Sequence, residues 1–448
     1  MKIAFSLGWY FPTECGGSEV YVDALARTLT AQGAQCVIAA PSKDDKEKSY
    51  VWNGIPVYRF PIKSKDLTLE EIRGDVPPSG LDRFAAWLKE QKPDIYHQHS
   101  CTYGCDHFNL RIAKSLGCKV VETVHVPGLI CCRGTMMLFG ENACDGKIDL
   151  SRCASCWGHD RGIPEAASNI IANVPMMISE KFGKYNLKMK NATIFSRFST
   201  AMARRALVEI RHQRVLEHFS LNDRMIAVCQ WLYDALLING ISKEKLFLSF
   251  HGLLGSPRDK EKNLSRDSDT LKLAFFGRWT KVKAVELIAL ATIAVPQNIE
   301  VQLTIFGILQ TKEDELYRKY VLNIIKGNPR VQIKEPVPHE KIQETMQQFD
   351  LIAVPSLWLE TGPYVVLEAQ AAGVPVIGSR LGGIAEHVTH GINGWLVDIG
   401  SVKKWKEAVC FLAKNPSFVR KLKSLDTKVR SVEDVASEMM VLYKELID

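Results

Sequence analysis

Two carboxylates flank a turn in the segment Glu360-Thr-Gly-Pro-Tyr-Val-Val-Leu-Glu368, which runs on into Ala-Gln-Ala-Ala-Gly-Val-Pro-Val-Ile. Gly362 and Pro363 indicate the turn, and the residues after them predict a helix that contains Glu368. The first turn of a helix carries N–H groups without intrahelical partners and the positive end of the helix dipole, so it attracts phosphate. The flanking carboxylates can accept hydrogen bonds from hydroxyl groups. This segment therefore predicts a site for a sugar nucleotide.

Two cations follow a predicted strand in the segment Phe276-Gly-Arg-Trp-Thr-Lys-Val-Lys283. Arg278 and Lys283 would lie near the carboxyl end of that strand, where two fixed positive charges suit a diphosphate. Because most Arg and Lys side chains are simply solvated, the alternative is an ordinary pair of surface charges. Gly16 and Gly17 follow the first predicted strand. They would let the backbone approach a diphosphate, although any strand-to-helix turn can use glycine.

Histidines end two predicted strands of the N-terminal half. Tyr96-His97-Gln98-His99 ends one strand, and Thr123-Val-His125 ends another. Imidazoles at the carboxyl ends of strands in one sheet can face the same ligand. A single histidine is more often a satisfied structural residue, so His97 and His99 are equally well explained as supports for His125.

Cysteines gather in the segment 126–164, as Cys131-Cys132-Arg-Gly-Thr, Cys144-Asp-Gly and Cys153-Ala-Ser-Cys156. The Cys153-x-x-Cys156 spacing is typical of a zinc knuckle, and Cys144 with Cys131 or Cys132 would complete a tetrahedral site. We take Cys132 as the fourth ligand. The segment has few apolar residues for its length, so a bound ion would supply the order that burial cannot. Reduced thiols, a transient redox pair and an iron–sulfur cluster remain alternatives.

Strands alternate with helices along the chain in two runs, which is typical of two α/β units with parallel sheets. The first run of predicted strands covers 2–7, 36–40, 95–97, 119–125, 225–229 and 246–250. The polar segment 255–270 is almost free of apolar residues and predicts a linker. The second run covers 271–276, 301–306, 351–354 and 374–377. We expect an N-terminal domain over 1–254 and a C-terminal domain over 271–448, whose last helix can pack back on the first domain.

These motifs together resemble the retaining GT-B glycosyltransferases of family 4, also called glycosyltransferase group 1. The resemblance rests on Gly16-Gly17-Ser18-Glu19, on the five-residue spacing of Arg278 and Lys283, and on the E-x7-E pattern of Glu360 and Glu368. It implies two Rossmann-like doubly wound domains that face a cleft. Similar cysteine-bearing insertions occur in a subset of this family.

The resemblance also implies roles for single residues. Arg278 and Lys283 would hold the donor diphosphate, and Glu368 the ribose hydroxyls. Glu360 and His125 would act at the transferred sugar, and amides near Gly362 and Tyr364 would reach the phosphates. Pro363 offers no N–H, and Ala284 stands where the family usually has glycine.

Composition sets the broad class. A chain of 448 residues with 46% hydrophobic and 24% charged residues is an ordinary globular protein that is too long for one core. A net charge of +7, spread along the chain, does not predict nucleic-acid binding. The N-terminus predicts a strand instead of a signal peptide, and no apolar run is long enough to span a bilayer, so we expect a cytoplasmic protein. The basic, partly aromatic segment 181–214 fits either an anionic membrane surface or a solvated helix.

The sequence thus predicts a hexosyltransferase that uses a nucleoside diphosphate sugar and a glycan or lipid-linked glycan acceptor in cell-surface polysaccharide biosynthesis. By the resemblance, it retains the anomeric configuration and needs no cofactor for the chemistry, leaving zinc a structural role. A GT-B epimerase or phosphorylase would share the same cleft. A non-catalytic sugar-nucleotide-binding protein would keep the fold but usually lose one of the charged residues, all of which are present here.

Overall fold

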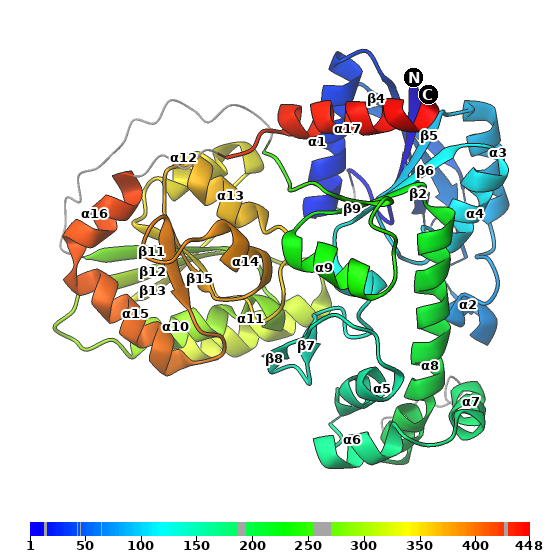
Figure 1. Ribbon diagram of the computed structural model, residues 1–448. Helices are drawn as coiled ribbons and strands as arrows, with labels where there is room; N and C mark the ends of the chain where they lie inside the picture. Colours follow the sequence, from blue (N-terminus) through cyan, green and yellow to red (C-terminus); the bar gives the residue numbers. More distant parts are fainter. Residues whose placement is uncertain are drawn as a thin grey trace. The chain divides into compact units, whose positions relative to one another are not determined.

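The computed structural model describes residues 1–12, 16–42, 44, 46–63, 65–160, 162–185, 194–253, 270–424 and 429–448. The chain divides into two units (Figure 1): Met1–His251 with Val432–Asp448 form unit 1, and Gly252–Ser431 form unit 2. The predicted linker 255–270 lies outside the described residues except for Thr270. The C-terminal helix α17 (Val432–Ile447) is part of unit 1, where it packs against α1 (Gly17–Ala31).

Unit 1 is built on an eight-stranded sheet in the order β10-β9-β6-β5-β1-β2-β4-β3, in which β3 pairs antiparallel with β4 and every other pair is parallel. The strands are β1 (Lys2–Ser6), β2 (Gln35–Ser42), β3 (Lys48–Trp52), β4 (Ile55–Pro61), β5 (Ile95–Gln98), β6 (Lys119–Val124), β9 (Arg224–Ala227) and β10 (Leu246–Leu248). The chain moves outward from β1 in one direction and then returns to β5 on its other side, so the winding reverses between β1 and β5.

Helices cover both faces of this sheet. Ala4, Tyr96 and residues of α3 (Leu81–Gln91) and α4 (His107–Ser115) form the core on one face. Successive side chains of a strand point to opposite faces, so Phe5 and His97 lie on the other face, together with Tyr21 of α1. The remaining helices of this part are α2 (Leu69–Arg73) and α9 (Gln230–Ile238).

The chain between β6 and β9 forms a largely helical insertion. It begins with the 3-10 turn η1 (Pro127–Leu129) and the short antiparallel pair β7 (Met137–Leu138) and β8 (Asn142–Ala143). The helices that follow are α5 (Leu150–His159), α6 (Glu165–Ile171), α7 (Met176–Tyr185) and α8 (Ile194–Leu221). The first three of these helices pack against α8. In the described part of the chain, no helix has the length and apolar character needed to cross a bilayer.

Unit 2 has a six-stranded, fully parallel sheet in the order β13-β12-β11-β14-β15-β16. Its strands are β11 (Leu271–Arg278), β12 (Val301–Ile308), β13 (Val331–Lys334), β14 (Leu351–Val354), β15 (Val376–Ser379) and β16 (Gly394–Val397). In chain order this is 3-2-1-4-5-6, the doubly wound arrangement that binds ligands where the winding reverses, here between β11 and β14. β11 pairs with β12 as far as Arg278 but with β14 only at Leu273 and Ala274. Beyond Ala274, β11 and β14 therefore no longer pair with each other.

Helices flank the unit 2 sheet on both faces. One core contains residues of α10 (Val285–Ile293), α11 (Lys312–Ile325), α15 (Val402–Lys414) and α16 (Pro416–Ser424). The other contains residues of α12 (Ile342–Met346), α13 (Tyr364–Ala371) and α14 (Gly382–His387). Short 3-10 turns, η3 (Lys281–Lys283) and η4 (His339–Lys341), precede α10 and α12. The predicted α/β class is confirmed in both units.

Candidate active site

An ion pair lies at the reversal point of the unit 2 sheet. The Nζ atom of Lys283, in the turn after β11, is 2.5 Å from Oε1 of Glu360, in the loop after β14. The Ser356 hydroxyl donates a second hydrogen bond, of 2.7 Å, to the same oxygen. The Lys283 side chain is 25% exposed, whereas that of Glu360 is 6% exposed. The structure therefore joins two residues that the sequence placed in separate motifs, and it leaves the cation partly open to solvent.

The backbone around Lys283 explains a departure from the family pattern. Ala284 ends the 3-10 turn with a φ of 50°, in the left-handed region that favours glycine, while its side chain is fully buried in the core. The Lys283 ammonium also lies 5.7 Å from the ring centre of Trp358. A glycine at this position would relieve the backbone, whereas the alanine side chain fills the core.

The Glu360 backbone is held by the start of α14. The Gly383 N–H donates to the carbonyl of Glu360 at 2.6 Å. A Cβ atom on Gly383 would lie 2.8 Å from the carbonyl oxygens of both Glu360 and Thr361. A Cβ on Gly382, whose φ is +49°, would also lie within 3.0 Å of this backbone. Two glycines are needed for this close approach, which fixes the backbone that carries the Glu360 side chain.

Arg278 has a carboxylate partner of its own. Its NH2 atom is 3.4 Å from Oδ2 of Asp314, a buried residue in the first turn of α11. Burial would raise the pKa of Asp314, but a hydrogen bond from the Gln310 backbone and the charge of Arg278 outweigh it and lower that pKa. The Arg278 side chain remains 43% exposed, so the guanidinium is oriented by Asp314 and still accessible.

Glu368 lies inside α13, as the sequence predicts, and is paired with a histidine. Its Oε1 atom is 3.3 Å from Nε2 of His339, in the turn before α12. The hydrogen bond to Glu368 raises the pKa of His339 above its usual value.

The helix α13 begins at Tyr364 after the capping residue Pro363, so Gly362 and Tyr364 lie at its N-terminus. Tyr364 packs against the small buried cluster of Leu253, Leu367 and Ala371.

Unit 1 brings its histidines together in a buried chain. Nε2 of His125 is 2.9 Å from Nδ1 of His99, and Nδ1 of His125 is 3.1 Å from Nε2 of His251. His97 is held separately, by the Tyr443 hydroxyl of α17 at 2.6 Å and the Thr123 hydroxyl at 2.8 Å. These imidazoles line the face of the sheet that is covered by α1.

His97, His99 and His125 are neutral at physiological pH. Burial lowers the pKa of His97 to about 3. Burial, followed by the neighbouring imidazoles, holds the pKa values of His99 and His125 well below the ordinary value for histidine. A neutral imidazole carries one N–H, so His125 donates to one neighbour and accepts from the other. These two contacts therefore orient His125 as a neutral ring.

Gly16 and Gly17 start α1, as expected from the sequence. Gly16 caps this helix in an extended conformation that any residue can adopt, with a φ of −138°. Its N–H donates to the buried Glu19 carboxylate at 2.6 Å. The helix start is thus built around Glu19. Nothing in the backbone of Gly16 itself requires glycine.

The four predicted zinc ligands line one small cavity of about 30 Å³, together with Cys131, Arg133 and Arg152. In the part of the chain that the structure describes, however, no three His, Cys, Asp or Glu side chains are close enough together to hold an ion. The Cys144 thiol instead contacts Asp145 at 3.7 Å, and Cys156 accepts from the Phe139 N–H at 3.1 Å. The thiols are therefore gathered but do not form a coordination sphere, and zinc binding stays a prediction.

Sequence reasoning missed several supporting residues, namely Ser356, Gly383, His339, Asp314 and His251. Apart from Gly383, each acts on a predicted residue across a turn or from another element, so no local spacing reveals it. The Gly-Gly pair after β15 was a visible signal for close backbone approach.

Comparison with known protein families identifies the class of this protein. Residues 257–429 match the model for glycosyl transferases group 1, and residues 16–168 match the glycosyl transferase 4-like domain. The chain belongs to the group 1 glycosyltransferases. The two matched regions contain all the predicted donor residues, His125 and the cysteines, and the prediction of a glycosyltransferase is confirmed. The subset with a cysteine-bearing insertion stays a prediction.

Curated relatives carry related names. A D-inositol 3-phosphate glycosyltransferase of Pseudarthrobacter chlorophenolicus is 30% identical over 154 residues, which are 34% of this chain and 36% of that protein. D-inositol 3-phosphate glycosyltransferase 1 of Catenulispora acidiphila is 26% identical over 425 residues, covering 92% of this chain and 85% of that protein.

Solved structures with the same architecture cover almost the whole chain. Sucrose-phosphate synthase of Thermosynechococcus elongatus has a TM-score of 0.65 at 17% identity, covering 99% of this chain and 98% of its own. Anabaena HepE in complex with UDP and glucose has a TM-score of 0.58 at 15% identity, covering 100% and 98%. Both comparisons bear on the fold, and the predicted GT-B fold with two Rossmann-like units is confirmed.

Proposed function

We propose that this glycosyltransferase moves a hexose from a nucleoside diphosphate sugar to a hydroxyl group of a glycan or lipid-linked glycan, with retention, in the synthesis of a cell-surface polysaccharide. The observation that carries the proposal is the Lys283–Glu360 pair at the reversal point of the unit 2 sheet. Open α/β sheets bind ligands at this point, and here a partly exposed cation is already oriented there.

The diphosphate is held by the two cations. Lys283 has three N–H donors and gives one to Glu360, which leaves the others for phosphate oxygens. Arg278 presents a guanidinium that Asp314 orients and that remains accessible. Together with the N-terminus of α13, these charges neutralise the leaving diphosphate, so the chemical step needs no metal ion.

The two carboxylates act on different parts of the donor. Glu368 binds the ribose hydroxyls, and Glu360 acts next to the breaking glycosidic bond. The leaving phosphate helps to deprotonate the acceptor hydroxyl on the same face of the sugar, which gives retention. His125 contributes a neutral, fixed imidazole beside the transferred sugar.

Known proteins indicate which substrates to test first. Anabaena HepE has been solved with UDP and with UDP-glucose, so uridine nucleotides come first among donors. The curated relatives are named for D-inositol 3-phosphate, which makes inositol phosphate a useful acceptor control.

A membrane-bound acceptor is supported by the insertion. Exposed apolar side chains of α6, α7 and the first turns of α8 include Ile170, Met177, Ile178 and Phe198. Basic residues of α8 contact other parts of unit 1, however, since Arg204 is buried over the Trp157 ring and Arg205 donates to the Ala172 carbonyl. We infer that these exposed apolar side chains hold the protein peripherally on the cytoplasmic face of the membrane. Sedimentation with vesicles that contain anionic lipid tests this inference.

The proposal is tested with a panel of sugar nucleotides. Binding of the correct donor should raise the melting temperature, and at equal concentration a tighter donor should raise it further. Incubation of that donor, labelled in the sugar, with glycan acceptors should give a labelled glycan of unchanged anomeric configuration. Release of an epimerised sugar, or binding without any turnover, would instead support an epimerase or a non-catalytic binding protein.

A further inference from the structure

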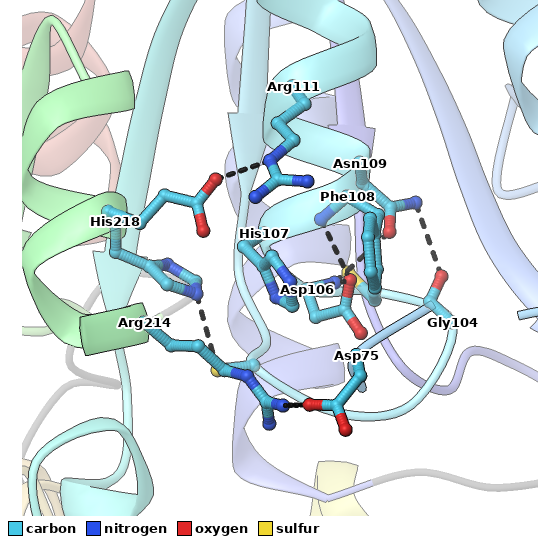
Figure 2. Close-up of polar contacts among 12 residues, drawn as sticks. Asp75, Gly104, Asp106, His107, Phe108, Asn109, Arg111, Arg214 and His218 are labelled. Atoms are coloured by element: carbon cyan, nitrogen blue, oxygen red, sulfur yellow. Dashed lines mark hydrogen bonds and ion pairs between the residues drawn. The ribbon is translucent and has the colours of Figure 1, made fainter. Parts of the chain in front are cut away.

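A cysteine, a histidine and a glutamate form a hydrogen-bonded series in unit 1 that plays no part in the proposed transfer. Cys101 is an exposed residue in the loop after β5, and its Sγ atom is 3.7 Å from Nε2 of His218 in α8. Figure 2 shows the His218 ring with its contact to a sulfur atom. The other nitrogen of His218, Nδ1, is 2.8 and 3.1 Å from the two carboxylate oxygens of Glu122 in β6. A surface thiol thus has an imidazole within hydrogen-bonding distance, and the imidazole has a carboxylate behind it.

The series is rigidly held. His218 and Glu122 are almost fully buried, with side chains 1% and 2% exposed. The side-chain amide of Asn222 donates to Glu122 at 2.7 Å and to the His218 carbonyl at 2.9 Å. The buried carboxylate therefore fixes the imidazole so that Nε2 faces the sulfur of Cys101. In such an arrangement a third group orients the base, and the base activates the nucleophile.

The charges around the imidazole favour its protonated form. Burial alone would lower the pKa of His218, but Glu122 and Cys101 raise it well above the ordinary value. Asp106 and His107, at the start of α4, face the same ring. Burial raises the pKa of Asp106 to about 6 and lowers the pKa of His107 to about 4. Arg214, also on α8, forms an ion pair with Asp75 (Figure 2), and its NH2 atom is 3.1 Å from Oδ1 of Asp75.

A neighbouring thiol shows the contrast. Cys105 is fully buried, its sulfur lies 3.3 Å from the Ser6 hydroxyl, and burial raises its pKa. It has no imidazole beside it among its described contacts, and solvent cannot reach it. Cys101 differs in both respects, because an imidazolium stabilises a thiolate and exposure gives reagents access.

We propose that Cys101 is a modification site, a nucleophilic thiol activated by His218 and Glu122 that forms mixed disulfides with small-molecule disulfides. The proton of the Cys101 thiol passes to His218 Nε2, giving a thiolate. The thiolate attacks one sulfur of the disulfide, a new S–S bond forms, and the old S–S bond breaks. The second sulfur leaves as a thiolate and takes up a proton, so one thiol and one disulfide give one mixed disulfide and one thiol.

The test uses 2,2′-dithiodipyridine on the full-length protein, with each modified cysteine identified by peptide mass mapping. Cys410, a half-buried cysteine of unit 2, is the reference in the same sample. For each thiol the rate at pH 5.5 is divided by the rate at pH 9, which removes differences in access. We expect this ratio to be about tenfold or more higher for Cys101, since an ordinary thiol is almost fully protonated at pH 5.5.

Variants assign the effect to the series. Glu122→Gln keeps the shape of the carboxylate but removes its charge, so the Cys101 ratio should fall to that of Cys410 while the rate at pH 9 is kept. Cys101→Ser should abolish the fast reaction. If Glu122→Gln does not fold, the wild-type pH profile alone decides. An equal ratio for Cys101 and Cys410, or an unchanged ratio in folded Glu122→Gln, would overturn the proposal.

Discussion

The two units use the same doubly wound architecture but place opposite electrostatic environments near the reversal of each sheet. In unit 2, Lys283 and Glu360 form an ion pair whose cation is partly exposed. In unit 1, His99 and His125 form a buried chain whose pKa values are lowered by burial, so it carries no charge at neutral pH. We infer that unit 2 is suited to binding an anion and unit 1 to orienting a neutral group.

The difference follows from the free energy of desolvation. A buried charge is costly unless it is paired, and the Lys283–Glu360 pair keeps one partner near solvent. Such a cation can share its N–H donors with an incoming phosphate. Neutral imidazoles avoid the desolvation cost but give up long-range attraction for a charged ligand. The division predicts that donor affinity depends on unit 2 and that unit 1 affects transfer.

The largest effect is expected from Gly383→Ala. The added Cβ would lie 2.8 Å from two backbone oxygens, so the Glu360 loop must move. We expect the free energy of unfolding to fall by about 1–3 kcal/mol and transfer to drop on the order of 100-fold. Thermal melts and steady-state kinetics measure both.

Gly128→Ala is the matched control in unit 1. A Cβ there would meet nothing closer than a Val126 methyl group at 3.7 Å. It should leave stability and transfer nearly unchanged. Equal effects of the two substitutions would show that the Glu360 loop is not specially constrained.

The two carboxylates of unit 2 should differ in the step that they affect. Contacts to ribose are shared by ground state and transition state, whereas contacts near the breaking bond strengthen as charge develops. Glu368→Gln should raise the donor KM about tenfold with a smaller change in kcat. Glu360→Gln should mainly lower kcat. The opposite ranking would contradict the assigned roles.

The cavity lined by the predicted zinc ligands lies in unit 1, so changes there should leave donor binding to unit 2 intact. If the four predicted thiols move together around zinc, purified protein should hold about one ion per chain. Cys153→Ser should lose the ion and lower the melting temperature, while donor binding to unit 2 should persist. Cys410→Ser is the control that should change none of these. Metal-free protein of full stability would leave the cysteines as ordinary thiols.

The smallest effect concerns His339. Its pKa is raised from 6.5 by Glu368, so the pair stabilises the fold fully below pH 6.5 and loses this contribution as the pH rises through the raised pKa. Wild type should exceed His339→Asn by about 0.2–1 kcal/mol at pH 6, after allowance for solvent screening, and by less at pH 9. The buried imidazoles of unit 1 destabilise both proteins equally in acid, so they cancel in this difference. A difference that does not change with pH would exclude the pair.

The sequence predicted the alternation of strands and helices because buried strands leave short apolar runs and turns leave glycine and proline. Val354 and Arg278 end strands within two residues of the predicted positions. The donor residues were found because they follow those strands directly. Pairings across the sheet, such as Lys283 with Glu360, depend on strand order and were not visible. His251 was missed because it reaches His125 from more than 100 residues away along the chain.

The most direct test of the central claim is calorimetric titration of Lys283→Ala with the nucleoside diphosphate of the preferred donor. Lys281→Ala is the matched control, since it removes the same charge from an exposed lysine in the same turn. Lys283→Ala should weaken binding by about 1.5–3 kcal/mol, and Arg278→Ala similarly, because each removes a charge-assisted contact. Lys281→Ala and His125→Asn should bind like wild type. Unchanged affinity in Lys283→Ala would contradict the claim that the Lys283–Glu360 pair forms the diphosphate site.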